Sequence, residues 1–190
     1  KAVGYRFTRE GMKQLIGLNR PAAIEKFPQL FPGCPESGEA CLQRYRAWMD
    51  DYIRENGVPV KPGLRELLAW LKQAHILCAV ATSTFTNVAI GYLKNAGVLN
   101  CFAAIVGGDQ VTKSKPDPEI FQLAMRALGK QTPETCVVFE DSRNGLLAGA
   151  NGGFPVIVVP DLFDPTLELP GLCYARCARL DEAIDVIQNS

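Results

Sequence analysis

The sequence lacks the features on which several classes of protein depend. Its charges balance, with 20 Lys and Arg residues against 20 Asp and Glu residues, so no polybasic face is implied. We therefore expect neither nucleic acid nor an anionic membrane as a partner. The longest apolar runs are far shorter than the roughly 20 residues that a membrane-spanning helix needs.

Histidine is nearly absent, since His75 is the only one, and no second cysteine pair accompanies Cys173 and Cys177. These two thiols stand four residues apart without further ligands, which argues against a zinc site. The seven cysteines are odd in number, and several, such as Cys78 and Cys136, lie in apolar runs. That distribution is typical of buried thiols in a reducing compartment, and we expect a cytoplasmic protein.

The chain also lacks a signal-peptide pattern, and it begins with Lys1 rather than with methionine. We expect that a segment has been removed from its front. Hydrophobic residues nevertheless make up 47% of the sequence. That fraction is enough for a sizeable core, and it argues against a disordered protein.

The pattern in the first part of the chain is helical. Amphipathic helices are expected over residues 8–16 and 37–55. Prolines and a glycine between 28 and 35 predict a loop, and the segment 58–63, with its two prolines, is typical of a hinge. We therefore predict a helical domain over residues 1–59.

After the hinge, short apolar strands alternate with helices. The pattern predicts strands over 76–81, 103–106, 135–139 and 155–159, and helices over 64–72, 86–95, 118–128, 143–150 and 180–187. Continuously apolar strands that are separated by helices indicate a parallel sheet covered on both faces. We therefore predict an α/β fold, with a doubly wound parallel sheet over residues 60–190.

Hydroxyl side chains follow the first predicted strand. Ligands of a doubly wound sheet bind beyond the carboxyl ends of the strands, which is where Thr82, Ser83 and Thr84 stand, just before a helix. Their hydroxyls, the free amides of the helix and the positive end of its dipole would form an anion site. The alternative is ordinary helix capping, for which Ser and Thr are common.

The loop after the second predicted strand holds Lys113 and Lys115, in the string KSKPDPEIF. Pro116 keeps Lys115 in extended backbone and out of the following helix. A lysine held on a rigid loop at this edge of the sheet can neutralise a phosphoryl group. The alternative is an ordinary solvated surface lysine.

Glu140 and Asp141 follow the third predicted strand. Two adjacent carboxylates repel each other and raise each other's pKa unless a cation is present. Mg²⁺ takes oxygen ligands and resolves that repulsion. The alternative is that Asp141 or Ser142 caps the next helix. Hydroxyls, a lysine and paired acids on three loops at one edge of a sheet together indicate phosphoryl transfer assisted by a divalent metal.

These strings resemble known motifs. ATSTF, KSKPDPEIF and VVFEDSRNGLLAGANGG resemble, in this order, motifs two, three and four of the haloacid-dehalogenase (HAD) superfamily. The chain looks similar to the subgroup with a helical cap inserted early, which contains beta-phosphoglucomutase and many small sugar-phosphate phosphatases. The resemblance spans nearly the whole chain. It implies a cap domain over residues 1–59 and a HAD-like core domain over 60–190.

The resemblance implies a role for each candidate residue. Thr82 resembles the motif-two hydroxyl that binds the phosphoryl oxygens, with Ser83 beside it. Lys115 resembles the motif-three lysine, which pairs with the phosphoryl group and the nucleophile. Asp141 resembles the motif-four metal ligand, with Glu140 as its partner in the acidic pair, and the implied cofactor is Mg²⁺.

Arg20 lies in the stretch LIGLNRPAAIEKF. That stretch resembles the cap segment whose arginine reaches the non-reacting end of the substrate, so the resemblance implies that Arg20 is a substrate-binding residue. The alternative is a surface arginine near the start of a helix. The expected substrate is a small phosphorylated metabolite.

The chain departs from the family at the first motif. No DxDx[TV] string occurs in it, although in the family the first Asp of that string attacks phosphorus and the second acts as general acid and base. The strand that carries it is normally central in the sheet, so we expect the first core strand to be missing. Without the nucleophile, covalent phosphoryl transfer fails. We expect these residues alone to be inactive unless a retained N-terminal peptide supplies the motif.

The cap favours a phosphatase over a mutase. In the mutase, a cap lysine just before the second hinge contacts the substrate phosphate, whereas a gapless alignment on Pro62 and Gly63 places Asp50 and Asp51 there. An acid repels a phosphate. We expect a Mg²⁺-dependent phosphatase with an aspartyl-phosphate intermediate. The alternatives are a phosphomutase similar to beta-phosphoglucomutase and, if the gene lacks the first motif, a non-catalytic phosphate-binding pseudoenzyme.

Overall fold

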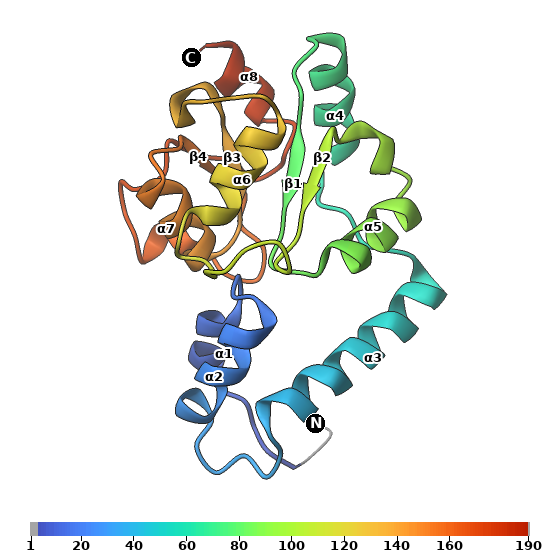
Figure 1. Ribbon diagram of the computed structural model, residues 1–190, viewed down its shortest axis with the longest axis vertical. Coiled ribbons are helices and arrows are strands. Elements are labelled where there is room, and N and C mark those ends of the chain that lie inside the picture. The colour runs from blue at the N-terminus through green and yellow to red at the C-terminus, as the bar shows by residue number, and fades with distance from the viewer. Residues whose placement is uncertain (1–3, 190) are drawn as a thin grey trace.

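A computed structural model describes residues 4–189, which form an α/β fold (Figure 1). The strands of this part of the chain are β1 (Ala79–Ala81), β2 (Ala104–Val106), β3 (Val138–Glu140), β4 (Val156–Val158) and β5 (Ala175–Arg176). All pairs are parallel and lie in two sheets, one of order β1-β2 and one of order β3-β4-β5.

From α4 (Leu64–Gln73) to β4, the helices alternate with the strands. The α-helices are α1 (Arg9–Leu15), α2 (Arg20–Leu30), α3 (Gly38–Asn56), α4 (Leu64–Gln73), α5 (Thr86–Asn95), α6 (Glu119–Ala127), α7 (Arg143–Asn151) and α8 (Ala183–Gln188). Short 3₁₀ turns are η1 (Leu99–Cys101), η2 (Pro133–Thr135) and η3 (Pro165–Leu167). Within the described residues, no helix has both the length and the apolarity to cross a membrane.

Strand β4 shows how the sheet is covered on both faces. Successive side chains of a strand point to opposite faces. Val156 and Val158 pack with Leu146 of α7, whereas Ile157 packs in the cluster that α4 and α8 build. Helix α6 packs on β1 and β2, and α7 on β3 and β4. The predicted doubly wound parallel α/β fold is confirmed.

The parallel strands are divided between two sheets that do not pair with each other. Strand β1 bonds only to β2, and β3 bonds only to β4, so each has one edge without a strand neighbour in the part of the chain that is described. No strand precedes β1 among residues 4–78. The expectation that the first core strand is missing from these residues stays a prediction.

Two helices before the hinge, α1 and α3, form where they are predicted, whereas α2 (Arg20–Leu30) was not predicted. Thr8 caps α1, and Ser37 caps α3. The loop expected over 28–35 is wrong for its first residues, because α2 continues through Pro28 to Leu30. Phe27 and Phe31 are buried there with their rings 5.0 Å apart, and this packing outweighs the hydrogen bond that proline cannot make. The division into domains at residue 59 stays a prediction.

Candidate functional site

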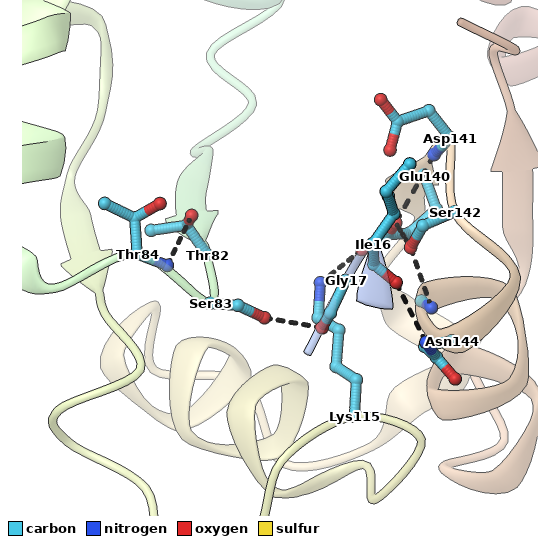
Figure 2. A network of polar contacts seen from close by, with 11 residues as sticks. Ile16, Gly17, Thr82, Ser83, Thr84, Lys115, Glu140, Asp141, Ser142 and Asn144 are labelled. Carbon is cyan, nitrogen blue, oxygen red and sulfur yellow. Dashed lines mark hydrogen bonds and ion pairs between the residues drawn. The ribbon is translucent and has the colours of Figure 1, made fainter. Parts of the chain in front are cut away.

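The carboxyl ends of β1 and β3 open into a cavity of about 630 Å³. The loops after both strands line it, together with Lys115 and residues from α2, α3 and α5. Figure 2 shows Thr82–Thr84 on one side and Glu140–Ser142 on the other, with Lys115 and Gly17 between them. The sequence-predicted residues Thr82, Ser83, Lys115, Glu140, Asp141 and Arg20 all line this one cavity.

The hydroxyl loop after β1 does not cap the next helix. Helix α5 begins at Thr86, and no side chain of its N-cap position bonds to its amides. Instead, Thr82 Oγ1 accepts a hydrogen bond from the Thr84 amide (3.2 Å), and Ser83 Oγ donates to the carbonyl of Gly17 (2.7 Å). The capping alternative is therefore wrong for these three residues, and Thr82 and Ser83 lie at the cavity wall.

Lys115 is buried, with 6% of its surface exposed. Its ammonium forms an ion pair with the Glu140 carboxylate and lies 4.5 Å from the centre of the Phe121 ring. The alternative of a solvated surface lysine is therefore wrong for Lys115. It describes Lys113 well, since that side chain is 72% exposed and pairs with Asp117 at 3.6 Å.

The Glu140 carboxylate is turned into the protein. One oxygen pairs with Lys115, and the other accepts hydrogen bonds from Ser142 Oγ (3.0 Å) and from the Asp141 amide (3.3 Å). Gly145 follows at a position where an added Cβ would overlap this carboxylate, so the glycine of the EDSRNG string makes room for Glu140. In this arrangement Glu140 holds Lys115, and its predicted role as a metal ligand stays a prediction.

Asp141 presents its carboxylate to the cavity, with 38% of the side chain exposed. Burial and, secondly, the Glu140 carboxylate raise the pKa of Asp141, while Lys61 and Lys115 oppose that increase. Ser142 is the residue that caps α7, since its Oγ accepts from the Gly145 amide (3.0 Å). Because Ser142 does this, Asp141 is not needed for capping.

Asp141 fits one part of a site for a hard divalent cation. Carboxylate oxygens such as those of Asp141 are the ligands that Mg²⁺ prefers. Among residues 4–189, no group of three or more His, Cys, Asp and Glu side chains is placed to hold a metal ion. The residues present therefore supply a carboxylate for the ion but not a complete set of ligands.

Arg20 stands in the first turn of α2, where Asn19 caps the helix by accepting from the Ala22 amide (3.1 Å). Its guanidinium pairs with Glu39 at 3.0 Å and is part of the cavity lining. The position of Arg20 at the start of a helix agrees with the surface-arginine alternative. Its place in the cavity lining agrees with the substrate-binding prediction. Its role stays a prediction.

Sequence reasoning missed how the segment 16–19 is held against the core. Ser83 bonds the carbonyl of Gly17, Asn144 Nδ2 donates to the carbonyl of Ile16 (2.8 Å), and the Asn19 amide donates to Ser114 Oγ (2.8 Å). Gly17 has a positive φ, +86°, and lies close to Ser142, and the glycine in LIGLNR is the one sequence signal for this contact.

The chain matches the model of the haloacid dehalogenase-like hydrolase family over residues 2–153. It belongs to this family. Among curated proteins, it is 42% identical over 103 residues to a phosphorylated carbohydrates phosphatase from Thermotoga maritima, a match that covers 54% of this chain and 45% of that protein. It is 38% identical over 122 residues to protein CbbY from Cereibacter sphaeroides, covering 63% of this chain and 53% of the relative. The chain thus spans about half the length of these relatives.

Solved structures of the family share the fold. CbbY from Rhodobacter sphaeroides in complex with phosphate is 28% identical, with a TM-score of 0.78 over 96% of this chain and 83% of that one. Beta-phosphoglucomutase from Clostridium difficile has a TM-score of 0.79 at 20% identity, covering 99% of this chain and 83% of that one. The resemblance that motifs two to four indicate is therefore confirmed at the level of family and fold.

Proposed function

We propose that the protein is a Mg²⁺-dependent phosphatase of a small phosphorylated metabolite, a sugar phosphate or a similar compound. The observation that carries the proposal is the convergence of Thr82, Ser83, Lys115 and Asp141 on one cavity at the carboxyl ends of β1 and β3. The similarity to a phosphatase of phosphorylated carbohydrates supports the substrate class.

The phosphoryl group binds between the hydroxyl loop and Lys115 in this proposal. Thr82 donates its hydroxyl hydrogen to the phosphoryl oxygens, and Ser83 does so after exchanging the bond that its hydroxyl makes with the carbonyl of Gly17. The Lys115 ammonium neutralises part of the charge that develops during transfer. Glu140 holds Lys115 in place through the ion pair. Lys115 and Glu140 are nearly excluded from solvent. Water therefore screens the attraction between the Lys115 ammonium and the phosphoryl oxygens only weakly.

Asp141 would hold Mg²⁺, with Glu140 as the second acid of the pair. When bound, the ion polarises the phosphoryl group and offsets the repulsion between the two acids. The cavity also receives Arg20, which we assign to the non-reacting end of the substrate.

The nucleophile is assigned to the aspartate of a DxDx[TV] motif on a segment outside these 190 residues, and the reaction passes through an aspartyl-phosphate. The free edges of β1 and β3, together with Ala81 and Phe139 in the cavity wall, support a position for that segment between the two sheets. These 190 residues alone are then inactive.

A mutase is the less favoured activity because of the surroundings of Asp50. That residue lies 3.9 Å from Arg46 on α3, and Asp51 pairs with Arg54. Both positions carry an acid where the mutase has a lysine, although Arg46, the partner of Asp50, lines the cavity. Hydrolysis requires only one phosphoryl site, so phosphatase activity is the simpler use of this cavity.

Turnover of hexose monophosphates by the protein carrying the first motif tests the proposal. We expect inorganic phosphate to accumulate, and no phosphate to appear when the first-motif segment is left out. Conversion of glucose 1-phosphate into glucose 6-phosphate without phosphate release would establish the mutase instead. Absence of both reactions across sugar phosphates, nucleotides and phosphoglycolate would support the pseudoenzyme.

A further inference from the structure

Lys61 brings a positive charge from the hinge to the acidic pair. Its Nζ donates to the carbonyl oxygens of Val159 (3.2 Å) and Pro160 (3.3 Å). The same atom lies 3.7 Å from Asp141 Oδ2 and 3.6 Å from Asp161 Oδ2. With 29% of the side chain exposed, the ammonium is held mainly by protein oxygens rather than by water.

Carbonyl and carboxylate oxygens are also the ligands of a hard divalent cation. Lys61 therefore occupies one face of the carboxylate that the proposed Mg²⁺ ion uses. Two cations beside one carboxylate oxygen repel each other. A divalent ion that binds Asp141 consequently weakens the attachment of Lys61.

The backbone around Lys61 joins α3 to α4. On its C-terminal side, the carbonyl of Pro62 accepts from the Leu180 amide (3.0 Å), so this end is fixed to the core. On its N-terminal side, the Val58 amide donates to Asn95 Oδ1 (2.8 Å), an exposed bond. Through its bonds to Val159 and Pro160, the Lys61 side chain adds a further contact between the segment 58–63 and the loop after β4.

We propose that Lys61 competes with the divalent cation for Asp141 and thereby couples occupancy of the metal site to the hinge at residues 58–63. The proposal rests on the metal role assigned to Asp141 above. Such coupling is reciprocal. Cation binding releases Lys61 from its anchor, and a neutral side chain at position 61 strengthens cation binding.

Direct titration of the protein carrying the first motif with Mn²⁺, followed by the electron paramagnetic resonance signal of the free ion, tests the competition without relying on turnover. Lys61→Met removes the charge and keeps an unbranched apolar chain, so it is expected to bind Mn²⁺ about tenfold more tightly than wild type. Lys61→Arg keeps the charge and is expected to stay within about twofold of wild type. Asp141→Asn is expected to abolish binding in every background.

The variants distinguish a failure of the competition by Lys61 from a failure of the metal site at Asp141. If Asp141→Asn abolishes binding while Lys61→Met binds no more tightly than wild type, the competition is wrong and the metal site stands. If Asp141→Asn binds Mn²⁺ like wild type, the assigned metal site itself is wrong, and the role of Lys61 with it. No binding by either wild type or Lys61→Met also overturns the competition.

Hydrogen exchange of the wild-type protein provides a second measurement that needs no variant at Lys61. Saturating Mn²⁺ is expected to speed amide exchange at residues 58–61 several-fold, and Asp141→Asn is expected to remove this response. Unchanged or slower exchange on binding Mn²⁺ would contradict the release of Lys61.

Discussion

Lys115 and Glu140 form an ion pair that is nearly closed to solvent, with 6% and 9% of their side chains exposed. Removing one partner of such a pair leaves an uncompensated charge in the interior. Lys115→Met is therefore expected to lower the free energy of unfolding by about 3–5 kcal/mol. Urea denaturation of the purified protein measures the difference.

The matched control removes both charges. Lys115→Met combined with Glu140→Gln is expected to recover about 1–2 kcal/mol of the loss, because no buried charge then remains unpaired. Ser142 can still donate to the amide oxygen of the new side chain. A double variant less stable than Lys115→Met would show that Glu140 is stabilised by groups other than Lys115.

Asp141 gives the fold a pH dependence that runs opposite to that of a paired carboxylate. Burial and Glu140 raise its pKa above the ordinary 3.8, so the folded state binds the proton more tightly than the unfolded state. Stability is therefore lost as the pH rises through the folded pKa and regained as the pH falls toward 3.8. In metal-free buffer at pH 7, Asp141→Asn is expected to raise Tm by about 1–2 °C, a small change because solvent reaches the carboxylate.

Thermal unfolding of Asp141→Asn and wild type between pH 4 and 7, with a chelator present, checks this prediction. The Tm difference is expected to shrink toward the acidic end. A variant less stable than wild type at pH 7 would mean that the contact with Lys61 outweighs burial and the repulsion from Glu140.

Residue types and spacing predicted which side chains meet, but not how they pair. The KPDPEIF and EDSRNG strings indicated that Lys115 and the acidic pair serve one site. The bond between Lys115 and Glu140 joins residues 25 positions apart, and its direction depends on side-chain packing that periodicity does not encode. Lys61 went unnoticed for the same reason, because a lone lysine before Pro62–Gly63 carries no pattern.

The first turn of helix α7 packs directly against the Glu140 carboxylate of the site. Gly145 lies where a Cβ would overlap the Glu140 carboxylate, whereas a Cβ on Gly91 in α5 meets nothing within 4 Å. Gly145→Ala is expected to displace Glu140 from Lys115 and to cost about 1–3 kcal/mol. Gly91→Ala is the matched helical control and is expected to stabilise the protein by about 0.5–1 kcal/mol.

Denaturation curves of these two variants measure the difference between them. Equal effects of the two substitutions would mean that the first turn of α7 shifts without cost to the ion pair. The comparison separates crowding at the site from the general preference of helices for alanine over glycine.

Element boundaries followed local signals where these were strong. Helix α5 begins and ends where its periodicity predicts, at Thr86–Asn95, and Ser37 caps α3. Strand β1 is shorter than predicted, since it starts at Ala79 and leaves Ile76 and Leu77 exposed. An apolar run predicts a buried strand, but its length depends on having a partner, and β1 pairs with only one strand in the described chain.

At the scale of the molecule, the order of strands and helices was sufficient to predict a doubly wound α/β fold. The division into two sheets, of order β1-β2 and β3-β4-β5, was not predicted from that order. The shape of the cavity was not predictable, because it depends on how the segment 16–19 lies against the core. Its bonds to Ser83, Ser114 and Asn144 are all long-range contacts.

The Mg²⁺ dependence of phosphate release from hexose monophosphates, by the protein carrying the first motif, tests the proposed phosphatase site most directly. Wild type is expected to release phosphate only when Mg²⁺ is present, and Asp141→Asn is expected to lower kcat on the order of 100-fold or more. Phosphate release that persists in a chelator, or an Asp141→Asn variant with wild-type turnover, would contradict the assignment of Asp141 and with it the proposed mechanism.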